Sequence, residues 1–180
     1  MSSATSSRSI YKRLPMFVYD FKFDDLSIIA YNHFLKPQDH NKIKPAFYVI
    51  NFEDLSRSHR CNPLEKNTMK DITDASESAR TILMGLNREW IKRQGDFFVE
   101  SPINFLTAII WYLRRYGDVE FCTLPQVIQV MEVNYDELFT LLRTEKEIEV
   151  LINPFVNAYL NDVMAQLEGQ VAAAKYRWRN

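Results

Sequence analysis

The stretch Pro102–Tyr116 constrains the fold more than any other part of the chain, because it is apolar on most sides. Its pattern predicts a helix with Ser101 as N-cap and Pro102 in the first turn, ending at Gly117. A helix with apolar residues around most of its circumference must be covered by other elements. We therefore predict that Pro102–Tyr116 is the central helix of a bundle.

The segments around this stretch supply helices that can cover it. Apolar residues at helical spacing predict a helix that begins near Thr73, runs to about Arg93 and stops at Gly95. Further helices are predicted over Leu124–Met131, Tyr135–Arg143, Glu145–Leu151 and from Pro154 to about Lys175. Residues 72–180 are therefore expected to form a predominantly all-α domain.

The front of the chain has a different pattern. Residues 1–15 are rich in serine and are predicted to be a disordered leader. The β-branched and aromatic runs Met16–Asp20 and Ala46–Phe52 predict buried strands, and a helix is predicted between them over Leu26–Leu35. Strand, helix and strand suggest a parallel βαβ unit, which two strands alone cannot stabilise. The expected fold is an α/β fragment over residues 16–71 followed by the all-α domain, mostly α overall.

The charge balance restricts the partners that the whole surface can attract. Lysine and arginine number 22, aspartate and glutamate 23, so the net charge of −1 gives no support for bulk binding to nucleic acid. Basic residues nevertheless gather at Arg57 and Arg60, and again at Arg88, Lys92 and Arg93. These five residues are candidate contacts to DNA or to another subunit; a solvated surface is the simple alternative.

No pattern of residues predicts catalysis, a metal site or a bound cofactor. The four glycines are scattered, whereas a phosphate-binding loop needs clustered glycines. His59 and Cys61 lack two further metal ligands at the usual spacing. Carboxylate pairs such as Glu53-Asp54 stand in polar loops, where nothing shifts a pKa toward acid–base work. We therefore assign no catalytic, metal-binding or cofactor-binding residue.

Cysteine use and hydropathy bear on the compartment. The two cysteines, Cys61 and Cys122, are too few for a disulfide framework, which favours a reducing compartment. No apolar run approaches the roughly 20 residues that a membrane-spanning helix needs. The sequence therefore predicts a cytoplasmic chain without a transmembrane segment.

Four short motifs follow one another along the chain. Asp20 and Lys22 stand at the end of the first predicted strand, and Phe21 and Phe23 flank Lys22. Three more motifs follow: Asn62-Pro63-Leu64, Phe97-Phe98 and Thr123-Leu124-Pro125. By the order and spacing of these motifs, the chain from about Phe17 to Ala174 resembles the TraG/TraD-type coupling proteins of type IV secretion, especially the conjugal-transfer and mobilisation ATPases of the Bacteroides group. The chain departs from that family at Phe21 and Phe23, where the family motif has proline and glycine.

This resemblance implies a place within a larger machine. Members of the family are hexameric P-loop ATPases, anchored in the inner membrane, that use ATP and magnesium and pass relaxase-bound DNA to a secretion channel. Residues 16–71 would then belong to the parallel sheet of the P-loop NTPase domain, and the all-α domain would recognise the substrate. The phosphate loop expected before Phe17 and the acidic magnesium-site strand expected after the last helix do not occur. The chain alone is therefore expected to hydrolyse no ATP.

Two functions are expected on these grounds. The first is that of a coupling-protein segment whose helical domain recognises a relaxase, another relaxosome protein or DNA. The alternative is a free-standing helical adaptor for protein–protein contacts without ATPase activity. The family-motif positions are Asp20, Lys22, Asn62, Pro63 and Leu64.

Overall fold

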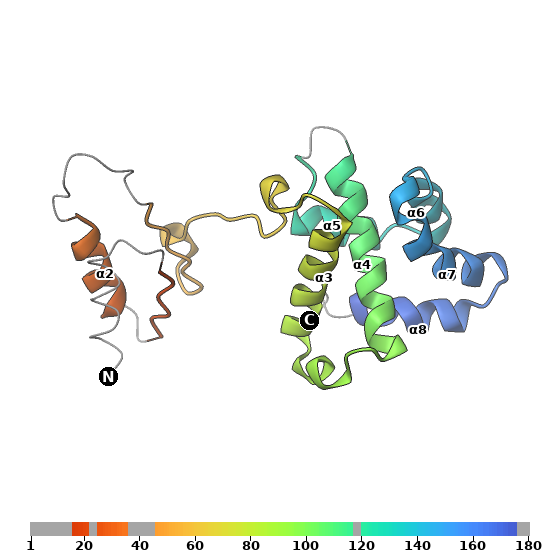
Figure 1. Ribbon diagram of the computed structural model, residues 1–180, viewed down its shortest axis with the longest axis horizontal. Helices are drawn as coiled ribbons and strands as arrows, with labels where there is room; N and C mark the ends of the chain where they lie inside the picture. Colours follow the sequence, from red (N-terminus) through yellow and green to blue (C-terminus); the bar gives the residue numbers. More distant parts are fainter. Residues whose placement is uncertain (1–15, 22–24, 36–45, 117–119, 176–180) are drawn as a thin grey trace. The chain divides into compact units, whose positions relative to one another are not determined.

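The computed structural model describes residues 16–21, 25–35, 46–116 and 120–175, and these residues are mostly helical, as predicted (Figure 1). The chain divides into two compact units, Met1–Arg60 and Cys61–Asn180. The sequence predicted the boundary between the two domains further along the chain, between residues 71 and 72. The predicted leader, residues 1–15, lies outside the described residues, and so does the motif residue Lys22.

The first unit contains the predicted helix α2 (Leu26–Leu35), so this prediction is confirmed. The backbone N–H and the hydroxyl of Ser27 donate to the Asp20 carboxylate at 2.9 and 2.7 Å, which attaches the preceding segment to the first turn. Tyr31 and Phe34 of α2 pack against the Phe47 ring, with centroids 5.3 and 5.6 Å away. Three aromatic rings therefore join α2 to the described segment that begins at Ala46.

The prediction of two strands in this unit is wrong, because Met16–Asp20 and Ala46–Phe52 contain no β-strand. Val49 exchanges bonds with His59: its carbonyl accepts the His59 N–H at 2.7 Å, and its own N–H donates to His59 Nδ1 at 3.0 Å. The Asn51 N–H donates to the Ser58 hydroxyl at 3.0 Å. Since mainly side chains accept these bonds, no ladder forms and the described residues hold no parallel βαβ sheet.

The second unit opens its helical region with α3 (Ile72–Leu86), which Asp71 caps in a capping box with Asp74. The helix ends well before the predicted Arg93. The reason is Asn87, whose backbone is extended and whose side chain accepts the Glu89 N–H at 3.3 Å. This bond starts a separate 3-10 helix, η3 (Arg88–Arg93).

Helix α4 (Phe97–Arg115) is the central element, which confirms the prediction of a buried helix. It begins before the predicted Pro102, because the Asp96 carboxylate caps it by accepting the Phe98 N–H at 2.8 Å. From Ser101 to Leu113 only Asn104 is not buried. No helix in the described part of the chain is long and apolar enough to span a membrane.

The described residues of this unit form four further α-helices: α5 (Leu124–Met131), α6 (Tyr135–Leu142), α7 (Glu149–Leu160) and α8 (Met164–Lys175). A short 3-10 helix, η4 (Lys146–Ile148), precedes α7. The single long helix predicted from Pro154 is wrong. Helix α7 runs through Pro154, and a left-handed residue, Asp162 (φ 57°), turns the chain into α8. Helices α3, α5, α6, α7 and α8 all contact α4 (Figure 1).

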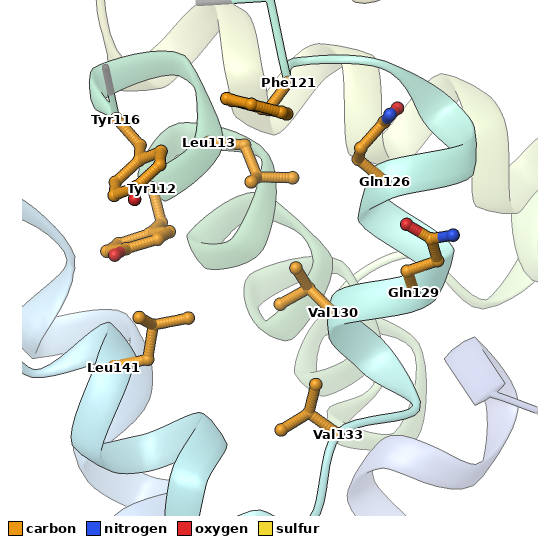
Figure 2. A pocket seen from close by; sticks show the side chains of 9 residues that line it. All are labelled: Tyr112, Leu113, Tyr116, Phe121, Gln126, Gln129, Val130, Val133 and Leu141. Atoms are coloured by element: carbon orange, nitrogen blue, oxygen red, sulfur yellow. The ribbon is translucent and has the colours of Figure 1, made fainter.

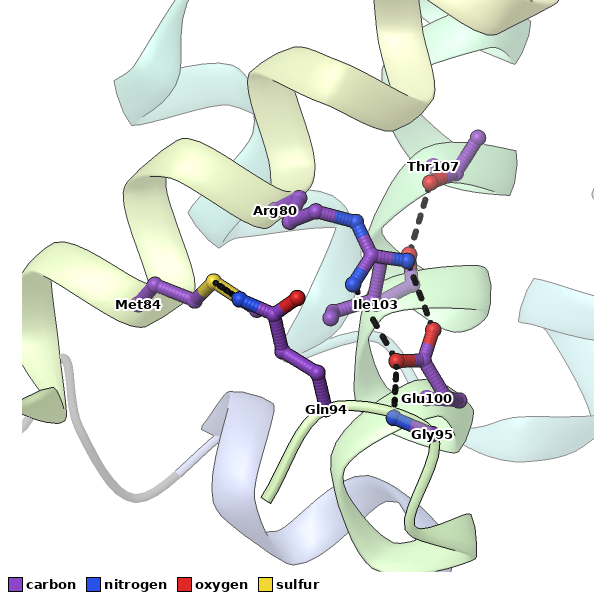
Figure 3. A network of polar contacts seen from close by, with 7 residues as sticks. All are labelled: Arg80, Met84, Gln94, Gly95, Glu100, Ile103 and Thr107. Atoms are coloured by element: carbon purple, nitrogen blue, oxygen red, sulfur yellow. Dashed lines mark hydrogen bonds and ion pairs between the residues drawn. The ribbon is translucent and has the colours of Figure 1, made fainter. Parts of the chain in front are cut away.

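A polar network fixes α3 against the start of α4 (Figure 3). Arg80 of α3 donates to both carboxylate oxygens of Glu100 of α4, at 3.1 and 2.7 Å. The Gly95 N–H donates to the same carboxylate at 3.0 Å, from a turn in which Gly95 has φ 86°. Because L side chains rarely adopt that φ, glycine suits this turn. The network therefore sets where the central helix begins.

Candidate functional site

The described residues of the second unit form a groove of about 430 Å³ between α4, α5 and α6 (Figure 2). Nine side chains line it: Tyr112, Leu113, Tyr116, Phe121, Gln126, Gln129, Val130, Val133 and Leu141. The groove has the size and the mainly apolar lining of a ligand or peptide site. It is therefore our candidate functional site.

One end of the groove is aromatic. Tyr112 and Tyr116 are one turn apart at the end of α4, and their rings stack with centroids 5.8 Å apart. The ring of Phe121 lies 6.2 Å from that of Tyr116. Tyr116 is 52% exposed and Phe121 is 48% exposed. Two large rings thus keep about half of their surface open to solvent beside a concave site.

The α5 wall carries the polar groups of the groove. Gln126, Gln129 and Val130 stand three and four positions apart and so share one face of this short helix. The Oε1 atom of Gln126 is buried and has no hydrogen-bond partner among the described residues. Buried acceptors nearly always have a hydrogen-bond donor in folded proteins. This atom therefore marks a position at which a donor group of a bound molecule could form a hydrogen bond.

The lining is electrically neutral. None of the nine described side chains that line the groove carries a formal charge. Burial raises the pKa of the Tyr112 phenol, so its hydroxyl stays protonated at neutral pH. The groove therefore offers apolar surface, two side-chain amides and two phenol groups, and none of its nine lining side chains is a carboxylate, imidazole, amine or thiol.

Contacts behind the groove hold its α4 wall in place. The Trp111 Nε1–H donates to Glu147 at 2.8 Å, and Arg115 lies 3.7 Å from Glu145 and 3.8 Å from Glu147. The Arg114 Nε–H donates to the Met69 carbonyl at 3.2 Å. These contacts join the end of α4 to the segments before α3 and around η4. The groove is thus built on fixed elements.

The structure places Arg88, Lys92 and Arg93 together on the exposed helix η3. Two of them are already paired: Lys92 lies 3.2 Å from Glu89, and Arg93 lies 2.6 Å from Asp96. Arg88 forms no ion pair with any described residue. The local positive charge is therefore largely compensated.

Arg57 and Arg60 belong to the first unit, whereas the other three candidate cations belong to the second. Both side chains are exposed. Arg57 ends the 3-10 turn η1 (Leu55–Arg57), where Asp54 is the N-cap. The pKa of the Asp54 carboxyl is lowered, first by its hydrogen bond from Ser56 and then, more weakly, by Arg57. Neither arginine lines a described pocket.

The family-motif residues have structural contacts. The Asn62 Nδ2–H donates to the Cys122 carbonyl at 2.8 Å, while its Oδ1 accepts the Leu64 N–H at 3.1 Å. Leu64 is fully buried in the core, and Pro63 is exposed. These contacts fix the start of the second unit to the segment that leads into α5. Asp20 accepts hydrogen bonds from Ser27, as described above.

The chemical groups most often used in catalysis are dispersed. No three His, Cys, Asp or Glu side chains among the described residues gather as metal ligands would. Burial raises the pKa of the Cys122 thiol to about 11, which makes it a poor nucleophile at neutral pH. Cys61 is exposed, and the ring of His59 bonds the backbone of Val49. No nucleophile–base pair forms from these groups.

Sequence reasoning did not identify the groove. Its residues come from α4, α5, α6 and the connections between them, and each looks like ordinary core or loop in sequence. The available signal was the pair Gln126 and Gln129 on an otherwise apolar short helix, together with the two aromatic residues, Tyr116 and Phe121, at the ends of a loop. Neither signal has meaning until α5 is placed beside α4.

Searches against protein-family models, curated proteins and solved structures find no match to this chain. The resemblance to coupling proteins therefore stays a prediction.

Proposed function

We propose that the second unit is a recognition module and that a segment of a partner protein binds in the groove between α4, α5 and α6. The observation that carries this proposal is the aromatic end of the groove, where Tyr116 and Phe121 remain about half exposed beside an apolar hollow. Exposed aromatic residues in a concave, uncharged site are typical of the anchor points of protein interfaces.

The chemistry of the lining suggests an amphipathic helix as the bound segment. Helical modules commonly bind such helices by laying their apolar face in a groove between helices. The rings of Tyr116 and Phe121 would contact aliphatic side chains at one end, and Val130, Val133 and Leu141 would contact them along the other. A polar donor on that helix would meet the unsatisfied Oε1 of Gln126.

The coupling-protein resemblance supplies the wider form of the proposal. In that form the partner is a relaxase or another relaxosome protein, the setting is the cytoplasmic side of a type IV secretion channel, and ATP and magnesium belong to the full-length hexameric protein. Support comes from Asn62-Pro63-Leu64, which stands where the compact helical unit begins. The adaptor alternative keeps the same groove and gives it a partner unrelated to DNA transfer.

Contact with DNA is the weaker form of the proposal. Glu89 and Asp96 already compensate Lys92 and Arg93, so few counterions would be released when phosphates bind. Of the three candidate phosphate contacts on η3, Arg88 is the one that forms no ion pair with a described residue. We therefore rank recognition of a protein above recognition of DNA.

A binding measurement tests the proposal. The purified chain is titrated with a relaxase and with relaxosome accessory proteins, and separately with single-stranded and duplex DNA, by fluorescence anisotropy. Removing the exposed rings with Tyr116→Ala and Phe121→Ala should weaken protein binding at least tenfold, because central aromatic anchors contribute roughly 1–2 kcal/mol or more.

The matched control is the pair Leu160→Ala and Val163→Ala, which removes exposed apolar side chains (68% and 42% exposed) at the turn between α7 and α8. This control should bind as the natural chain does. Equal binding by the groove variant and the control would contradict the proposal. If the natural chain binds DNA but none of the proteins, and Arg88→Glu abolishes the binding of DNA, the DNA form of the proposal is favoured instead.

A further inference from the structure

The segment Ala46–Phe52 of the first unit uses one of its two backbone edges. The Val49 N–H and C=O both bond to His59, at 3.0 and 2.7 Å, and the Asn51 N–H bonds to the Ser58 hydroxyl at 3.0 Å. Val49 and Asn51 therefore direct their backbone groups to the same side. In an extended strand, every second residue directs its backbone groups to the same side, and this segment has that pattern.

The opposite edge of this segment is open. The backbone N–H and C=O groups of Tyr48 and Ile50 have no hydrogen-bond partner in the described part of the chain. Burial alternates in the same register: Asn51 is 8% exposed, whereas Tyr48 is 75%, Ile50 is 54% and Phe52 is 88% exposed. An open strand edge with large apolar side chains is a template for pairing with another strand.

We propose that this edge is a dimer interface, in which the segments Ala46–Phe52 of two copies of the chain pair as antiparallel strands about a two-fold axis at Val49. In that register the Tyr48 N–H and C=O bond to Ile50 of the second copy, and the Ile50 groups bond to its Tyr48. Two-fold symmetry then places each open group opposite a complementary one. Tyr48 also faces an aliphatic Ile50, a favourable cross-strand pair.

The side chains of the open edge carry exposed apolar area that a second copy would cover. Tyr48 is 75%, Ile50 is 54% and Phe52 is 88% exposed. Because each aromatic side chain can bury roughly 150–250 Å², these three side chains present on the order of 300–500 Å² per copy. Covering them in both copies would remove about 600–1,000 Å², the size of a weak, reversible interface.

The local hydrogen bonds also limit the assembly to two copies. The edge that carries Val49 and Asn51 is already occupied by His59 and Ser58. A third strand would have to displace these bonds before it could pair along that edge. Pairing closes at the dimer, whereas a segment with two open edges would extend into a fibre.

Sedimentation velocity of the full chain over a concentration series tests this proposal. We expect a monomer–dimer equilibrium without larger species. Amide hydrogen exchange under the same conditions should show that the Tyr48 and Ile50 amides become protected as the concentration rises. Protection of the Val49 amide should not change with concentration, because its bond to His59 is internal to each copy.

Two substitutions locate the interface. Ile50→Pro removes one N–H from the open edge, and Ile50→Lys places two cations near each other in the dimer; each should weaken dimerisation at least tenfold. The matched control is Val150→Lys, which replaces an aliphatic side chain that is 82% exposed on α7. This control should dimerise normally. Circular dichroism of all variants should keep the helical signal of the second unit.

Three results would overturn the proposal. One is a chain that stays monomeric throughout the concentration series. Another is a dimer that Ile50→Pro and Ile50→Lys leave unchanged, which would place the interface elsewhere. The third is protection of the Tyr48 and Ile50 amides in the monomer, which would mean that a segment of the same chain covers the edge.

Discussion

Arg80 and Glu100 form a two-pronged ion pair that joins α3 to the first turns of the central helix α4. Arg80 Nη2 lies 2.7 Å from Glu100 Oε2, and Nη1 lies 3.1 Å from Oε1. The two side chains are 28% and 29% exposed, so solvent screens their attraction only in part. Glu100 also accepts the Gly95 N–H, which makes it the centre of the network that starts α4.

Breaking this pair should destabilise the second unit measurably. We expect Arg80→Ala to lower the free energy of unfolding by about 1–2 kcal/mol, because two charge-assisted hydrogen bonds are lost at a partly buried site. Urea unfolding followed by circular dichroism measures the change. Lys92→Ala is the control: its pair with Glu89 has both side chains 74% exposed, so its loss should be close to neutral. Equal effects of the two variants would contradict this ranking.

The same pair predicts how stability depends on pH. Hydrogen bonds from Arg80 are the first cause that lowers the pKa of Glu100 below its ordinary value of 4.5. In the unfolded chain Glu100 therefore takes up a proton at a higher pH than in the folded protein. The stabilisation is fully present above about pH 4.5 and is lost as the pH falls through the lower folded pKa. Glu100→Gln should flatten this acid limb of a plot of stability against pH.

Core packing around α4 gives a larger effect. Phe105 is fully buried, and its ring lies 5.3 Å from that of Phe155 in α7. Phe105→Ala should lower the free energy of unfolding by about 3–5 kcal/mol, because it leaves a cavity between two helices. Phe98→Ala is the matched control, since Phe98 belongs to the same helix but is 58% exposed. A loss of stability in the control as large as that of Phe105→Ala would show that Phe98 is covered in solution.

The parts of the fold that followed from sequence are those set by local periodicity. Helix α2 was predictable because its apolar residues recur at helical spacing, and the central position of α4 was predictable because that stretch is apolar on most sides. Boundaries were missed where one side chain decides them, as Asp96 does at the start of α4. The turn at Asp162 ends α7 well after Pro154, and neither a proline nor a glycine stands there to indicate a turn in the sequence.

The strands were predicted wrongly and the groove was not identified for a different reason, which is that both depend on tertiary context. Ala46–Phe52 has the residues of a strand, but a strand also needs a ladder partner, and His59 and Ser58 take one of its edges instead. The groove exists because α5 lies beside the end of α4. No local pattern specifies that placement, so Tyr112 and Gln126 could not be distinguished from ordinary core and surface residues.

Asn62 should be a structural residue whether or not the family resemblance holds. Its side chain bridges the Cys122 carbonyl, at 2.8 Å, and the Leu64 N–H, at 3.1 Å. Asn62→Ala leaves both backbone groups without this partner, so we expect a loss of about 1–3 kcal/mol in the free energy of unfolding. Asn67→Ala is the control, because among the described residues the Asn67 side chain bonds only the exposed Glu65. Unchanged stability in Asn62→Ala would leave a recognition role as the better explanation of this motif.

The two cysteines should differ sharply in their reaction with a thiol reagent. Cys122 is 1% exposed, and burial raises the pKa of its thiol to about 11, so at pH 8 only about one such thiol in a thousand is ionised. Cys61 is exposed to solvent at the start of the second unit. In a native protein treated with an aromatic disulfide reagent, we expect one equivalent to react promptly and Cys61→Ser to remove that phase. The second equivalent should appear only when urea unfolds the helical core. Prompt reaction of both thiols in the folded protein would mean that the segment between α4 and α5 opens readily, and that the groove which it borders is not a fixed site.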